Sequence, residues 1–293
     1  MNSMDLTAAV SELLNKDRFE YLDIIKREDG AKSLDIAKEI LRSRDITDPE
    51  EITKENIKVN KRLRRLVELG ILVSEGGTYD ISSLGRLLMI SKEDLKRNAE
   101  TMEKFHAFFE NHFVDDLPRE FFRQIYKLTD AHLTELPVQW VQEVIRHMER
   151  MEKKFYNMTE YLHDIPEGII ERKIREKESG KKEEIEIVII YQFYNYPQLN
   201  YSLEEELFKK LVNAGAEFRF INLEKERHPI GIRIVDDKWA TFGLARRLDG
   251  TLDRERAFIG SNREFITWCR DLMYHMWSFE ASPLDVEEVT AKR

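Results

Sequence analysis

The fold of the first part of this chain is decided by the stretch Val59-Asn-Lys-Arg-Leu-Arg-Arg-Leu-Val-Glu-Leu-Gly-Ile-Leu-Val-Ser-Glu-Gly-Gly-Thr-Tyr-Asp-Ile81. Its first half predicts a basic amphipathic helix that ends at Gly70, and its second half predicts two strands joined at Gly76-Gly77. The apolar residues at the three- and four-residue spacing of one helix face are Val59, Leu63, Leu66 and Val67. One face of this helix is therefore expected to be buried, while another is basic.

A helix that ends at glycine and is followed directly by a β-hairpin is the layout of a winged helix, whose last helix enters the major groove of DNA. Upstream, apolar residues at helical spacing in 3–27 and a second segment that begins at Ser33 predict the first two helices of a helix-turn-helix. Asp48-Pro49-Glu-Glu51 has the form of a capping box, but Thr53 is a competing start. The third helix is therefore either long or preceded by a short extra turn.

The candidate DNA-binding residues lie on this third helix. Between Glu51 and Leu66 there are six Lys or Arg against two Glu, although the formal net charge of the chain is −9. An acidic protein can bind DNA when its basic residues are concentrated where the phosphates lie. Early residues of a recognition helix reach base edges, and basic residues elsewhere on it fix its register on the backbone. The predicted base-edge contacts are Lys54, Asn56 and Asn60, and the predicted phosphate contacts are Lys58, Lys61, Arg62 and Arg65.

Length and composition predict two domains. The chain has 293 residues, more than a typical single domain, and it is 42% apolar and 35% charged, which indicates a well-cored and not a disordered protein. No linker rich in proline or glycine marks the boundary, which we place near residue 100. Residues 1–100 are the expected winged helix-turn-helix domain with the start of a connecting helix, and residues 101–293 are the expected effector and assembly domain.

The second domain carries the pattern of an α/β fold. Residues 185–193 form a continuous β-branched run that is typical of a buried strand of a parallel sheet. A helix over 203–212 and a strand over 217–221 complete a βαβ unit, a hairpin follows across Asp236-Asp237, and 138–156 predicts an amphipathic helix. The predicted fold class is thus a two-domain chain, an N-terminal winged helix-turn-helix followed by an α/β domain with a mainly parallel sheet.

A candidate ligand site follows the strand at 185–193. Open α/β sheets bind ligands at the carboxyl ends of their strands, and here the chain continues as an aromatic segment. Tyr194, Asn195 and Tyr196 are therefore the candidate ligand-binding residues. An aromatic core or dimer contact explains the same residues equally well.

The chain also resembles a known family. Residues 10–90 resemble the winged-helix domains of archaeal transcription regulators, through Leu13-Leu-Asn-Lys-Asp-Arg-Phe-Glu-Tyr-Leu22 and Leu66-Val-Glu-Leu-Gly-Ile-Leu-Val73. The second part resembles the effector domain of archaeal methanogenesis-regulator (Fil-type) proteins. The motifs that carry this second resemblance are Val114-Asp-Asp-Leu-Pro-Arg-Glu-Phe-Phe122, Leu128-Thr-Asp130, Leu248-Asp-Gly-Thr-Leu-Asp253 and Ile266-Thr-Trp-Cys-Arg-Asp-Leu-Met273. The resemblance implies a winged helix joined to an α/β sensor domain. The wing tip, Glu75-Gly-Gly77, has no Lys or Arg, so we expect the wing to contribute little to binding.

Motifs of enzymes and metal sites are missing from the sequence. It has no His-Glu-x-x-His, no Gly-x-x-x-x-Gly-Lys phosphate loop, no Gly-x-Ser-x-Gly and no His-x-Lys of the phospholipase D type. We therefore expect no catalytic residue, no metal and no cofactor. The single Cys269 lies within an apolar helical pattern and is expected to be a buried thiol. No apolar run of about 18 residues and no signal-peptide pattern occur, so a cytoplasmic protein without membrane contact is expected.

Together these patterns predict a DNA-binding transcription regulator. Its expected partners are double-stranded DNA, a second copy of itself in a homodimer, and a possible small-molecule effector. The helix at 95–109 is a candidate dimer seam. The alternative is a non-catalytic adaptor that uses its winged helix to bind another protein.

Overall fold

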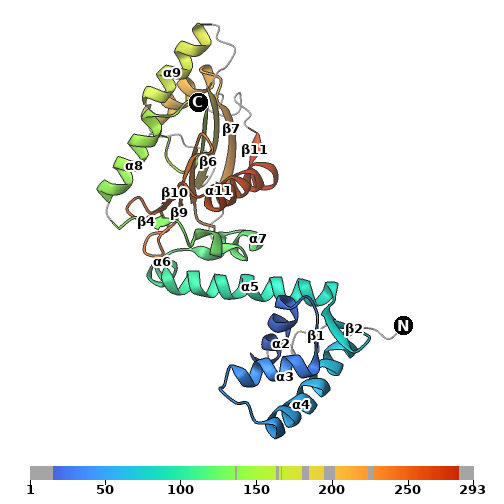
Figure 1. The fold of residues 1–293 in the computed structure, drawn as a ribbon. Helices are drawn as coiled ribbons and strands as arrows, with labels where there is room; N and C mark the ends of the chain where they lie inside the picture. Colours follow the sequence, from blue (N-terminus) through green and yellow to red (C-terminus); the bar gives the residue numbers. More distant parts are fainter. Residues whose placement is uncertain are drawn as a thin grey trace. The chain divides into compact units, whose positions relative to one another are not determined.

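A computed structural model describes residues 16–135, 137–162, 165, 167–179, 185–194, 202–223 and 227–283. The chain divides into two compact units, Met1–Lys96 and Arg97–Arg293 (Figure 1). Each unit is described by itself.

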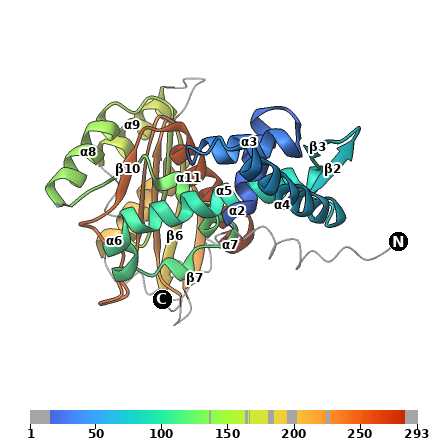
Figure 2. The same ribbon diagram turned by 60° about the horizontal axis from the view of Figure 1, so that its bottom comes forward.

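The N-terminal unit consists of helices and a small antiparallel sheet. Its helices are α2 (Lys16–Arg27), α3 (Ser33–Arg42), α4 (Pro49–Glu68) and the part of α5 (Ser83–Lys104) that ends at Lys96. Its strands are β1 (Ala31–Lys32), β2 (Leu72–Glu75) and β3 (Thr78–Ile81), in the order β1-β3-β2. Figure 2 shows the β2–β3 hairpin beside α4. Helices precede the hairpin in the order that the sequence predicts.

The boundaries of α4 follow from its end residues. The Asp48 carboxylate accepts a hydrogen bond from the Glu50 N–H at 3.0 Å, and Pro49 occupies the first turn, where no intrahelical donor is needed. The third helix is therefore the long one of the two alternatives, with 20 residues. Gly70 ends it with φ +73°, and the hairpin turns at Gly76 and Gly77 with φ +57° and +80°, in the left-handed region that favours glycine.

Apolar residues of the three helices and the sheet form one core in this unit. Val59, Leu63 and Leu66 of α4 are fully buried in it, together with Leu22 and Ile36 from α2 and α3. The predicted buried face of the third helix is confirmed. Truncating a residue such as Leu63 to Ala at this depth costs about 2–5 kcal/mol, because it removes apolar contacts and leaves a cavity.

The C-terminal unit is built on an eight-stranded mixed sheet of the order β11-β7-β6-β5-β8-β9-β10-β4. Its strands are β4 (His132–Leu133), β5 (Lys154–Thr159), β6 (Glu186–Tyr194), β7 (Glu217–Leu223), β8 (Ile230–Val235), β9 (Trp239–Leu244), β10 (Phe258–Gly260) and β11 (Ser282–Pro283). The predicted βαβ unit is present, because β6 pairs parallel with β7 across α10 (Ser202–Asn213).

The expectation of a mainly parallel sheet is wrong. Among the described strands only β5–β6 and β6–β7 are parallel, and the other neighbouring pairs are antiparallel. The reason is local. The three-residue turn over 236–238 joins β8 to β9 as a hairpin, and such short connections can join only antiparallel strands.

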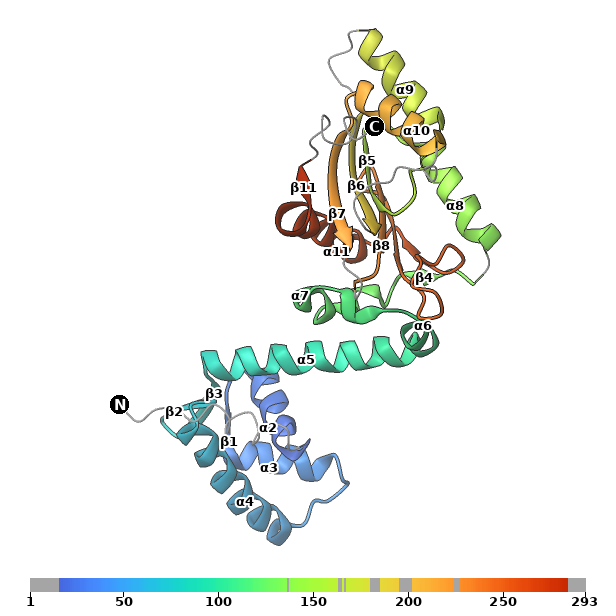
Figure 3. The ribbon, with the colours of Figure 1, turned by 180° about the vertical axis from the view of Figure 1, so that it is seen from behind.

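Helices cover both faces of this sheet (Figure 3). On one face the core contains residues of α8 (Pro137–Glu149), α9 (Glu167–Glu178) and α10. On the other face α11 (Arg263–His275) packs with the short helices α6 (His106–Asn111) and α7 (Arg119–Phe122). Cys269 of α11 is fully buried, as predicted, and burial raises the pKa of its thiol. No helix among the described residues is long and apolar enough to cross a bilayer.

Strand β5 was not predicted. The helix expected over 138–156 ends at Glu149, and the chain then enters the centre of the sheet. The Asp236 carboxylate fixes the backbone at the start of β5. It accepts hydrogen bonds from the backbone N–H groups of Glu152, Lys153 and Lys154 at 2.7, 2.7 and 2.8 Å. A contact from more than 80 residues away thus overrides the local helical pattern.

Candidate nucleic-acid interface

The candidate interface is the solvent-exposed face of α4. Helical spacing of about 100° per residue separates this face from the buried Val59, Leu63 and Leu66. Its exposed basic residues are Lys54, Lys58, Lys61, Arg64 and Arg65. Ile57 lies among them with 67% of its surface exposed.

Three of these basic residues pair with acids on their own helix. Lys54 contacts Glu51 at 2.7 Å, Lys58 contacts Glu55 at 3.3 Å, and Arg65 contacts Glu68 at 3.0 Å. The hydrogen bond and the charge of Glu51 raise the pKa of Lys54. Exposed ion pairs of this kind are weak and are screened by salt. Exchanging such a carboxylate for a DNA phosphate therefore costs little.

Lys61 and Arg64 form no ion pair with the described part of the chain, and both side chains are exposed. Arg64 is absent from the residues predicted from the sequence. It is three residues after Lys61 and seven after Ile57, so helical spacing places it on the same face. Lys61 and Arg64 thus offer two exposed charges on this face.

Three predicted residues lie at the edge of this face and not on it. Arg62 is half-buried, donates a hydrogen bond to the Tyr21 hydroxyl, and has its guanidinium carbon 5.8 Å from the centre of that ring. Asn60 accepts a hydrogen bond from the Tyr79 hydroxyl at 3.1 Å, and Asn56 is half-buried with its side-chain oxygen out of contact with water. Arg62 and Asn60 thus bind the helix to its own unit, whereas the buried side-chain oxygen of Asn56 has no hydrogen-bond partner.

The candidate ligand residue Tyr194 lies at the carboxyl end of β6, where the sequence predicts it. Its hydroxyl donates a hydrogen bond to the carbonyl of Gly250 at 3.3 Å, and the side chain is 41% exposed. Burial, followed by the charges of Glu160 and Asp116, raises its pKa to about 12, so the phenol is protonated at neutral pH. Asn195 and Tyr196 lie outside the described residues. The ligand-binding role of the three residues stays a prediction.

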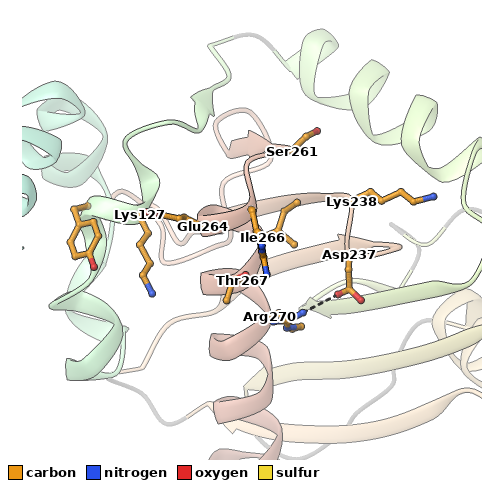
Figure 4. Close-up of a pocket in the computed structure, with 10 residues that line it drawn as sticks. Lys127, Asp237, Lys238, Ser261, Glu264, Ile266, Thr267 and Arg270 are labelled. Atoms are coloured by element: carbon orange, nitrogen blue, oxygen red, sulfur yellow. Dashed lines mark ion pairs between the residues drawn. The ribbon is translucent and has the colours of Figure 1, made fainter.

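A surface hollow of about 760 Å³ in the C-terminal unit is lined from the 3-10 helix η2 (Ile125–Leu128), the β8–β9 turn and α11 (Figure 4). Arg270 points toward Asp237 at 3.8 Å, and Lys127, Lys238 and Glu264 lie around them. The lining contains four cations, which include Arg263, and two carboxylates, so its formal charge is positive. The described residues contain no cluster of three or more His, Cys, Asp or Glu that could hold a metal ion.

No protein-family model and no curated protein matches this chain. Among solved structures, the archaeal chromatin protein TrmBL2 is similar with 12% identity and a TM-score of 0.36, over 81% of this chain and 88% of that chain. NucT from Helicobacter pylori (14% identity, TM-score 0.38) is similar over 53% of this chain and 99% of that chain. Nuc from Salmonella typhimurium, a phospholipase D family member, has 11% identity and a TM-score of 0.37 over 53% and 97%. Likeness at this level assigns no function to this chain.

Proposed function

We propose that the N-terminal unit is a winged helix-turn-helix that binds double-stranded DNA through α4, and that the chain is a transcription regulator. The observation that carries this proposal is the two-sided character of α4. Its apolar side is fully buried in the unit, while its exposed side bears five basic residues and is followed at once by a hairpin. Such a helix can enter the major groove without losing its support.

The exposed residues divide into two groups by their place along α4. Lys58, Lys61, Arg64 and Arg65 bind phosphates and fix the register of the helix on the duplex. Lys54 and Ile57 lie nearer the helix start and reach base edges. Lys54 donates hydrogen bonds to acceptors of guanine, and Ile57 packs on the methyl group of thymine.

The proposed regulator is a homodimer, since one helix gives modest affinity and two half-sites multiply it. An apolar stripe on α5 supports this. Leu87, Ile90 and Leu95 are 61%, 60% and 65% exposed and follow helical spacing. Pairing these stripes from two copies would remove them from water. The proposed seam lies within 83–104 and overlaps the segment 95–109 predicted from the sequence.

The C-terminal unit is proposed as the effector domain, without a catalytic role. Its mixed sheet carries Tyr194 at the end of a central strand, close to the His228–Asp116 pair, whose Nδ1 and Oδ2 atoms are 2.9 Å apart. A ligand that binds two conformations of the dimer differently would change the spacing of the two α4 helices and hence DNA affinity.

Selection of bound fragments from random genomic DNA by the full-length chain tests the proposal. Recovery of fragments that share a sequence repeated about one helical turn apart is the expected result. Failure to retain any duplex DNA at low salt would refute DNA binding and favour the adaptor alternative. A single unrepeated sequence would refute the dimer alone.

A further inference from the structure

We propose that the C-terminal unit holds a binding site for one oxyanion group, a carboxylate or a phosphate of a small molecule, between α8 and strands β5, β8 and β9. The proposal does not depend on DNA binding and uses none of the candidate ligand residues at the end of β6.

The site begins with a row of polar side chains across three strands. Asn157 of β5 pairs with Arg233 of β8, and Arg233 pairs with Thr241 of β9, so the three side chains lie side by side on one face of the sheet. They are 1%, 4% and 5% exposed. Other residues of this face form an apolar core with α8, α9 and α10. A buried polar row inside an apolar face is costly unless its groups are hydrogen-bonded.

Two donors at this row lack a partner. The Asn157 side-chain nitrogen and the Trp140 indole nitrogen are excluded from water and form no hydrogen bond within the described structure. Leaving such a group without a hydrogen bond costs about 1–3 kcal/mol, and buried polar groups without a partner are rare in folded proteins. The Arg233 guanidinium carbon lies 5.7 Å from the centre of the Trp140 ring and adds a buried positive charge. Both unsatisfied atoms are donors, so the missing partner is an acceptor.

These groups line a common cavity. Its volume is about 30 Å³, and its walls include Trp140, Asn157 and Arg233. A cavity needs a volume of about 10–15 Å³ for each water molecule that it holds, so this one fits two waters or one small oxyanion group. Gly231 and Gly243 lie next to the polar row, and a Cβ atom at Gly231 would meet the Leu252 side chain at 2.9 Å. Leu252 therefore closes this end of the cavity.

The charges of the lining favour an anion. Arg233 and Arg254 line the cavity against one carboxylate, that of Asp253. That carboxylate is already engaged, because it binds His112 Nε2 at 2.9 Å and accepts hydrogen bonds from the N–H groups of Glu255 and Arg256 at 2.7 and 3.1 Å. His112 Nδ1 lies 2.6 Å from the Phe108 carbonyl, which can only accept. By formal charge the lining thus contains two arginines and one carboxylate.

The indole N–H signal of Trp140 reports the site directly. The chain has four tryptophans, and Trp140→Phe identifies which indole signal belongs to Trp140 in the nitrogen–proton spectrum of the full chain. Titration with inorganic phosphate and, separately, with acetate at constant ionic strength is expected to shift this signal and the Asn157 amide signals. Chloride is the reference. A shift with phosphate alone would assign the ligand group as a phosphate, and a shift with acetate alone would assign it as a carboxylate.

Two variants and a control measure the contribution of each donor. Trp140→Phe removes one hydrogen bond and is expected to weaken anion binding about fivefold. Asn157→Asp replaces a donor with a like charge and is expected to weaken it on the order of tenfold or more. Trp277→Phe, on the opposite face of the sheet, is expected to leave the affinity unchanged. The proposal is overturned if neither anion shifts the Trp140 signal, because water alone then fills the cavity, or if Trp140→Phe and Trp277→Phe bind equally.

Discussion

Replacing Lys61 and Arg64 together by alanine tests the role of α4 most directly. Both side chains are exposed and neither has an ion pair with a described residue, so their loss leaves the core and the helix pairs intact. We expect a change in unfolding free energy within about 0.5 kcal/mol, as for other surface substitutions. A loss of DNA binding would then report lost phosphate contacts and not unfolding.

The size of the effect follows from counterion release. Each phosphate contact contributes about −0.9 to the slope of log K against log salt, so two contacts make the slope shallower by about 1.8 for each bound helix and by about 3.6 for a dimer. At about 0.1 M salt the same relation gives a loss of roughly 60-fold in affinity per bound helix. Fluorescence anisotropy on a labelled duplex across a salt series measures both quantities.

The matched control removes the same charge elsewhere. Arg146 and Arg150 are exposed at the end of α8 in the other unit, and their double alanine variant changes the net charge equally. If only the overall field mattered, both double variants would lose affinity together. An unchanged salt slope for the Lys61 and Arg64 variant, or an equal change in the control, would refute the proposed face.

Three further results are expected. Ile57→Ala loses a methyl contact worth about 0.8 kcal/mol, so preference for thymine at one position falls about fourfold in competition binding, and an unchanged preference would exclude that contact. Leu87→Glu with Leu95→Glu places charge in the proposed seam and gives a monomer by light scattering; a persisting dimer would place the seam elsewhere. Asp236→Asn destabilises by about 1–2 kcal/mol at neutral pH in urea unfolding. Burial raises the pKa of Asp236, but hydrogen bonds from three backbone N–H groups lower it by more, so the pKa lies below its usual value. This stability is present above the unfolded-state pKa and is lost as pH falls through the folded one, so the difference between wild type and variant must shrink in acid.

The sequence predicts the N-terminal unit well because its signals are local. Asp48-Pro49, Gly70 and Gly76-Gly77 each determine backbone geometry within a few residues. The C-terminal sheet depends on contacts that local patterns do not contain. Strand β5 follows a helix without a glycine or proline between them, and its entry is held by Asp236 from the far hairpin. The sequence shows one parallel βαβ unit, and the prediction of a mainly parallel sheet wrongly assumed the same pairing for the other strands.

Side-chain partners explain the differences at α4. Helical spacing can place Arg62 near the basic side, but it cannot show that Tyr21 in another helix supplies its partner. Asn60 is held in the same way by Tyr79 of the wing. The sequence is sufficient to predict Arg64, since its spacing from Lys61 places it on the exposed face.

The polar row of the C-terminal unit shows why a buried site is harder to predict than an exposed one. Asn157, Arg233 and Thr241 are separated by 76 and 8 positions, and only the pairing register of three strands brings them together. A shift of β8 by one residue in its pairing with β5 would turn Arg233 away from Asn157 and into the opposite core. The apolar alternation of Ile230, Ile232 and Ile234 toward that core fixes the register, so the residues that bury β8 are also those that aim its arginine into the cavity.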